Sequence, residues 1–224
     1  FFISSSIASI IAFFIALSIN VKNSIVDERK NGQNFTQLLK NKKLKIVCFI
    51  MFLVGGSFLT CLNFAAVFTK SINVLPITIF FLSYTVIALI MRIFFGWLPD
   101  KYGQVTFCKP ALILYGLSIG ILGLSINYIS VMSAGILFGI SHALVYPSIY
   151  TLALRFTDIS NKSKAFSICS VSFTFGGMIF SIIYGLIAET YSFKVMFLSC
   201  SIIVTLGFYC LIKLLEKEIL NEYR

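Results

Sequence analysis

Apolar runs of about 20 residues alternate with short polar segments along most of the chain. A helix needs about 20 mostly apolar residues to cross the hydrocarbon core of a bilayer. An open sheet edge is not stable in lipid, so we predict an all-α membrane protein with seven transmembrane helices. The predicted spans are residues 1–20, 46–69, 75–98, 107–126, 129–153, 165–188 and 194–213.

The composition agrees with this pattern. Hydrophobic residues make up 58% of the chain and charged residues only 12%, whereas soluble domains carry about 25% charged residues. The net charge of +10 would suit a nucleic-acid binder if the charge were gathered on a soluble surface. It lies instead between the spans, so we expect the lipid bilayer as partner and no nucleic acid.

Lysine and arginine are distributed unevenly across the predicted membrane. Sixteen lie on the side of segment 21–45, counting Arg92 as reaching that side, and only Lys70 and Lys194 lie on the other. Basic loops mark the cytoplasmic side of a membrane protein. We therefore expect residues 21–45 to be a basic cytoplasmic linker and residues 214–224 to be a cytoplasmic tail.

The linker 21–45 has two interpretations. Phe35, Leu38 and Leu39, followed by several lysines, would suit a short amphipathic helix at the membrane surface. A solvated basic linker fits the same residues. In both cases the segment separates one span from the following six.

Reactive or metal-binding chemistry is not indicated by the sequence. The six cysteines form no C-x-x-C pair and nearly all lie in apolar runs, so we interpret them as packing residues without a disulfide or metal. No span contains Asp or Glu, and no nucleotide-binding glycine loop is present. We therefore predict that the protein is not an enzyme and needs no cofactor.

The most charged stretch next to long apolar runs extends from Arg92 to Gly103. Arg92 lies inside an apolar run, where a charge must reach the interface or find a partner, and Asp100 is the nearest carboxylate. Gly96 would allow a close helix approach and Gly103 a tight turn. Lys101 lies where the chain has left the hydrocarbon core and is in water or among the lipid headgroups.

This stretch resembles the loop signature of the major facilitator superfamily, G-x-L-x-D-[RK]-x-G-[RK]-[RK]. The matching positions are Gly96, Leu98, Asp100, Lys101 and Gly103, while Gln104 and Val105 replace the final basic pair. A degraded copy is typical of the second half of that family. The chain begins with Phe1 and no Met, which we interpret as a fragment of a longer protein.

The resemblance implies how the spans are organised. Residues 1–20 would be the last helix of a missing N-terminal half, and residues 46–213 the six-helix C-terminal half. A weak internal repeat agrees, because Gly96-x-x-x-Asp100-x-Tyr102 recurs 89 residues later at the end of the sixth span. The second, third, fifth and sixth spans would then line the substrate cavity, and the fourth and seventh would face lipid.

Five polar or aromatic residues are candidates for that cavity: Asn63, Thr60, Tyr84, His142 and Tyr146. His142 is the sole histidine and lies within a span, so it would bind substrate or relay protons, or else be a neutral histidine bonded to a neighbouring helix. Tyr146 lies one turn further on the same face. Asn63 would line the cavity or join two helices.

Glycines at four-residue spacing indicate helix-packing faces. Gly116 with Gly120, and Gly135 with Gly139, have this spacing, and Gly176 with Gly177 forms a further small patch.

The sequence thus predicts a secondary transporter of a small solute that works by alternating access. Protons are a candidate coupling ion, with the carboxylate supplied by the missing half or the relay by His142. The composition, rich in Asn, Lys, Ile and Phe, favours the inner membrane of a bacterium.

A seven-helix receptor is the alternative, although short outer segments leave no room for a ligand-binding loop. An intramembrane enzyme lacks buried carboxylates.

The loop motif has two interpretations, a conformational latch and a charge that only marks the inner surface. If it is a latch, Asp100→Asn removes the negative charge that holds the helix ends, so we expect slower transport at unchanged membrane insertion. Uptake into proteoliposomes and the yield in the membrane fraction measure the two effects separately. Normal transport by the variant would rule out the latch.

Overall fold

The computed structural model describes residues 9–11, 13–15, 17 and 35–220. Within these ranges the chain consists of helices and short turns, without a strand. Residues 1–32 and 33–224 form two compact units. In the first unit the described residues are helical, and most of the predicted span 1–20 lies outside them.

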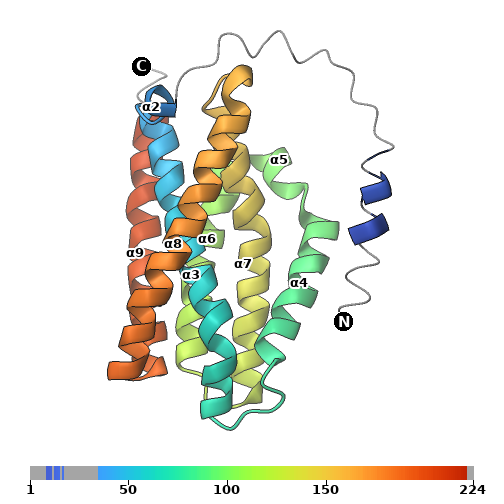
Figure 1. Ribbon diagram of the computed structural model, residues 1–224, viewed down its shortest axis with the longest axis vertical. Coiled ribbons are helices and arrows are strands. Elements are labelled where there is room, and N and C mark those ends of the chain that lie inside the picture. The colour runs from blue at the N-terminus through green and yellow to red at the C-terminus, as the bar shows by residue number, and fades with distance from the viewer. Residues whose placement is uncertain (1–8, 12, 16, 18–34, 221–224) are drawn as a thin grey trace. The chain divides into compact units, whose positions relative to one another are not determined.

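The second unit is a bundle of long helices that run side by side, with α9 at one edge and α4 at the other (Figure 1). Its helices are α2 (Phe35–Leu38), α3 (Lys42–Ser71), α4 (Ile79–Phe95), α5 (Leu98–Tyr102), α6 (Gln104–Gly123), α7 (Tyr128–Arg155), α8 (Lys162–Thr190) and α9 (Phe193–Leu220). A short 3-10 helix, Ile159–Asn161, precedes α8.

Five predicted spans correspond to helices that are long and apolar enough to cross a membrane, namely α3, α6, α7, α8 and α9. The sixth, α4, has 17 residues rather than the predicted 75–98. It begins late because Pro76 disfavours helical backbone at Leu75, and it ends at Gly96 before the separate short helix α5. The count of seven spans is therefore not established.

Two helix ends differ from the predicted boundaries. α3 begins at Lys42, because the Asn41 side chain accepts hydrogen bonds from the backbone N–H of Lys43 and Leu44 and so caps the helix. The lysines at its start are therefore helical. The last helix, α9, continues to Leu220 rather than ending at residue 213. Of the linker 21–45, residues 21–34 lie outside the described part of the chain, and Phe35–Leu38 form the short helix α2, with Leu38 buried.

Helices α3 and α8 pack closely through small residues. A side chain on Gly55 would collide with the backbone of Phe173 in α8, and one on Gly176 with the backbone of Phe52 in α3. The two helices therefore approach each other backbone to backbone, each supplying one glycine at the crossing.

The other predicted glycine faces also lie at helix contacts. Gly116 and Gly120 face Thr205 and Ser201 of α9, and Gly135 faces the Phe80–Ser83 turn of α4. Helix α6 therefore lies between α7 and α9, while α7 also packs against α4. The two copies of the weak repeat lie at opposite ends of the bundle, after α4 and at the end of α8 (Figure 1).

Matched glycine substitutions test the α3–α8 crossing. Gly176→Ala forces a methyl group against backbone that has no free rotation, so we expect a loss of about 1–3 kcal/mol in stability. Gly185→Ala in the same helix meets only the ring of Phe64 at 3.4 Å and serves as the control. Thermal unfolding in detergent compares the two, and equal midpoints would contradict the close approach.

Candidate functional site

His142 lies at the middle of α7 and is only 3% exposed. Its ring stacks on Phe58 of α3, with the centroids 4.5 Å apart and the planes 10° apart. Tyr84 of α4 and Tyr115 of α6 place their rings 5.9 and 6.0 Å away. Side chains from three other helices therefore converge on the sole histidine of the chain.

The surrounding rings also contact one another, and together with His142 we call them the His142 cluster. Its other members are Phe58, Tyr84, Tyr115, Phe138, Tyr146 and Phe173. Most ring pairs are tilted or edge-to-face, the geometry that aromatic quadrupoles favour.

Neither ring nitrogen of His142 makes a hydrogen bond with a described residue, and Nδ1 is buried. A histidine bonded to a neighbouring helix, one of the two interpretations of the sequence, is not what this structure contains. Leaving a buried polar atom unpaired costs about 1–3 kcal/mol. Stacking on Phe58 therefore holds the imidazole ring in place, while its nitrogens make no hydrogen bond with a described residue.

The His142 cluster has a closed side and an open side. Tyr115 and Phe138 have no exposed surface and close the cluster against α6. The half-buried rings are Phe58, Tyr84, Tyr146 and Phe173. They come from α3, α4, α7 and α8, the helices that the resemblance assigns to the cavity.

A chain of hydroxyl groups leads away from the cluster. The Tyr146 hydroxyl donates to the Tyr150 hydroxyl at 3.4 Å, and Tyr150 lies 3.0 Å from the Ser170 hydroxyl of α8. Ser170 in turn donates to the backbone carbonyl of Phe166. The chain runs toward the end of the bundle where α7 ends and α8 begins.

Asn63 and Thr60 do not share the cluster. The exposed Asn63 side chain donates to the Ser181 hydroxyl of α8 at 3.0 Å, so it links two helices while remaining on an open surface. Thr60 is completely buried and its hydroxyl donates to the carbonyl of Gly56 in its own helix. Thr60 thus contributes packing rather than an accessible polar group.

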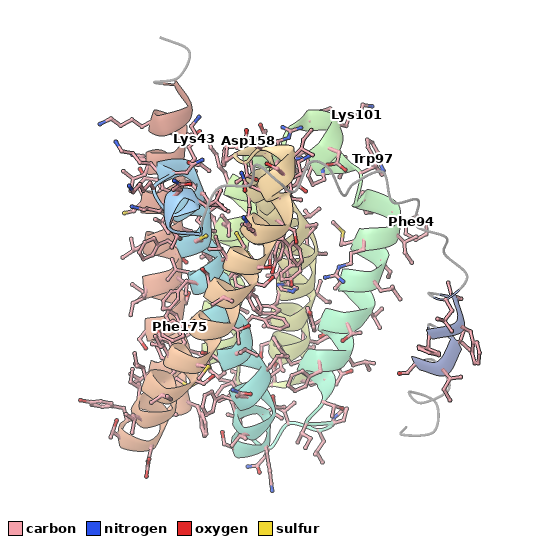
Figure 2. The ribbon with its side chains drawn as sticks, turned by 45° about the horizontal axis from the view of Figure 1, so that its top comes forward. Lys43, Phe94, Trp97, Lys101, Asp158 and Phe175 are labelled. Atoms are coloured by element: carbon pink, nitrogen blue, oxygen red, sulfur yellow. The ribbon has the colours of Figure 1, made fainter. Side chains whose placement is uncertain are left out.

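The loop motif forms a compact turn between α4 and α6. Gly103 has φ +96°, a conformation that a side chain would strain, which confirms the predicted tight turn. Asp100 accepts a hydrogen bond from Gln104 at the start of α6. The Lys101 ammonium lies 5.2 Å from the centroid of the Trp97 ring, and Figure 2 shows both at one end of the bundle.

Gly96 is placed differently from the expectation, and Arg92 forms no ion pair with a described carboxylate. A side chain at Gly96 would meet the carbonyl of Arg92 in its own turn, so this glycine mediates no contact with another helix. Arg92 is exposed and pairs with no carboxylate of the described chain, including Asp100.

Sequence reasoning missed Phe58, Tyr115, Phe173 and Tyr150. With 24 Phe and 10 Tyr in the chain, nothing local distinguishes these rings from aromatic residues that face lipid. One signal was present, because His142, Tyr146 and Tyr150 recur every fourth residue and so share one face of α7.

The cysteines are placed as unpaired thiols. Cys48 and Cys169 face each other across α3 and α8 with their Sγ atoms 3.7 Å apart. In the part of the chain that the structure describes, His, Cys, Asp and Glu form no group able to hold a metal ion.

The fold defines a class, a helical multi-pass membrane protein. A sequence model of the Major Facilitator Superfamily matches residues 46–222, most of the chain. The chain therefore belongs to this superfamily of membrane transporters, which confirms the resemblance. A search of curated proteins finds no match.

The contribution of the hydroxyl chain to the stability of the protein can be measured. Tyr150→Phe removes the shared hydroxyl between Tyr146 and Ser170, so we expect a loss of about 1 kcal/mol. Tyr191→Phe is the control, since Tyr191 is 77% exposed and its hydroxyl makes no hydrogen bond with a described residue. Denaturant titration in detergent measures the stability of both variants. An equal effect of the two substitutions would mean that the chain of hydroxyl groups contributes nothing to stability.

Proposed function

We propose that the chain forms the second half of a secondary transporter that carries a small solute by alternating access. The observation that supports this most is the half-open His142 cluster, which lies midway along the long helices. Transporters built from inverted repeats bind substrate at that depth. Membership of a transporter superfamily favours this function over the seven-helix receptor.

The open side of the bundle supports a second half as partner. Helix α4 packs mainly against α7 and leaves large apolar side chains uncovered, with Leu82, Leu89 and Ile93 each more than half exposed. A further set of helices in the same protein would cover this face and enclose the cluster. Residues 1–20 would be the last helix of that set.

The roles of the candidate residues follow from their placement. His142 supplies the unused hydrogen-bonding groups, and Tyr84 and Tyr146 supply aromatic walls with polar tips. Arg92 supplies a positive charge on α4, about two turns beyond Tyr84. Asn63 offers an amide further along the open face. A solute with both an apolar body and a polar or anionic group fits this set.

Proton coupling is supported by the hydroxyl chain. Tyr146, Tyr150 and Ser170 connect the neighbourhood of His142 with the end of the bundle that bears Arg155 and Lys162. A proton bound at His142 would change the charge of the cavity as it opens to either side. The uneven distribution of basic residues favours a cytoplasmic location for that end and for the C-terminal tail, and the composition favours a bacterial inner membrane.

His142→Phe tests the role of the imidazole. Phenylalanine keeps the stacking on Phe58 but removes both ring nitrogens, so we expect unchanged or higher thermal stability. Transport should fall by about tenfold or more, the usual effect of losing a positioned polar group. The full-length transporter in proteoliposomes, loaded with a pH-sensitive dye and given a panel of solutes, reports solute entry and proton movement together.

The stability measurement makes the result decisive. A stable His142→Phe protein that still transports at the normal rate would show that the histidine only packs. A stable protein that transports but no longer moves protons would assign the residue to coupling rather than to solute binding.

A further inference from the structure

Two cysteines are in contact near the start of α3 and of α8. The Sγ atom of Cys48 in α3 lies 3.7 Å from the Sγ atom of Cys169 in α8, so that one thiol donates a hydrogen bond to the other. The two residues are 121 positions apart in the sequence. Among the described residues, no other two thiols make such a contact.

The two cysteines have the same position relative to the glycine crossing of α3 and α8. Cys48 precedes Gly55 by seven residues, and Cys169 precedes Gly176 by seven, which is two helical turns on the same face of each helix. The backbone contact at the glycines therefore holds the two thiols opposite each other. A disulfide needs Cα atoms within about 7 Å, a separation that only closely packed helices provide.

The two thiols differ in access. Cys48 is 9% exposed and lines a hollow of about 180 Å³ between α3 and α8, together with Ser172. Cys169 has no exposed surface. A small molecule in the hollow therefore reaches Cys48 first, and Cys169 is in contact with the sulfur that has been reached. An accessible thiol next to a second, resolving thiol is the arrangement of redox-sensitive cysteines.

We propose that Cys48 and Cys169 are a reversible redox pair that hydrogen peroxide oxidises to a disulfide. The Cys48 sulfur attacks one peroxide oxygen and breaks the O–O bond. The other oxygen leaves as water with the thiol proton, and Cys48 becomes a sulfenic acid. The Cys169 sulfur then attacks the Cys48 sulfur, so that an S–S bond forms, the S–O bond breaks, and a second water leaves with the Cys169 proton. The two thiols lose two electrons, which the peroxide gains.

The disulfide ties α3 to α8 two turns before the glycine crossing. It joins residues 121 positions apart and so reduces the conformational entropy of the unfolded chain. Thiol reductants reverse it by exchange. This is the end of the bundle for which we propose a cytoplasmic location, where thiols are kept reduced. With that orientation, the cross-link forms when peroxide rises and then stabilises the α3–α8 contact.

Peptide mapping of the oxidised protein detects the cross-link. The full-length protein in bilayers is exposed to hydrogen peroxide, free thiols are blocked by alkylation, and a non-reduced digest is analysed by mass spectrometry. We expect a linked peptide that contains Cys48 and Cys169 and that disappears after treatment with dithiothreitol. Cys61, also on α3 but completely buried, is the internal control and should remain a free thiol.

Single substitutions separate the roles of the two thiols. In Cys169→Ser we expect a sulfenic acid at Cys48 that dimedone labels, because the resolving thiol is missing. In Cys48→Ser the buried Cys169 should stay reduced. Oxidation should raise the thermal unfolding midpoint of the unsubstituted protein by roughly 5–10 °C and leave that of both variants unchanged. Cys169→Ala replaces Cys169→Ser if the serine variant does not insert.

Absence of the linked peptide at a peroxide concentration that oxidises the exposed Cys210 would overturn the proposal. A cross-link that forms with copper phenanthroline but not with peroxide would also overturn it, since that result shows only that the thiols are close. Equal oxidation of Cys61 and Cys48 would contradict it, because unfolding rather than the hollow would then expose the thiols. None of these measurements depends on transport, so the redox pair can fail without affecting the proposed function.

Discussion

The close approach of α3 and α8 is the contact on which the centre of this protein depends. Gly55 and Gly176 let the two backbones meet, and this fixes where the neighbouring residues of each helix point. Phe58 lies one turn beyond Gly55, and Phe173 lies one turn before Gly176. The glycine crossing therefore brings both rings to the same depth, where they form one wall of the His142 cluster.

The histidine at that depth is an unusual core residue. Its ring packs like an apolar side chain, stacked on Phe58 and close to Phe138, yet its nitrogens have no partner among the described residues. A core selected only for stability would favour phenylalanine at this position. The unpaired imidazole therefore sets this residue apart from the apolar side chains that pack around it.

The loop motif and the cluster are linked through α4. Arg92 and Tyr84 lie two turns apart on this helix, and the helix ends in the turn that contains Asp100, Lys101 and Gly103. A shift of α4 relative to α7 would move the walls of the cluster and the loop together. Such a shift needs a smooth contact between the two helices, and Gly135 and Gly139 provide one.

The sequence predicted the helical membrane class, the approximate positions of α3, α6, α7, α8 and α9, and the superfamily, because the length of an apolar run and a charged loop motif are local features. It also predicted the turn at Gly103 and the glycine faces. It misplaced the ends of α4, because the effects of Pro76 and Gly96 on the backbone extend over only a few residues and hydropathy does not resolve them.

The site itself was only partly predictable. The sequence singled out His142, Tyr84 and Tyr146 because polar groups in apolar runs are rare. It could not separate the buried Thr60 from the exposed Asn63, three residues apart on one helix, because the neighbour that packs on α3 decides their exposure. Nor could it join Phe58 of α3 to His142 of α7. The length of apolar runs and the positions of charges can be read from the sequence, whereas the contacts between these rings form only when five helices have packed together.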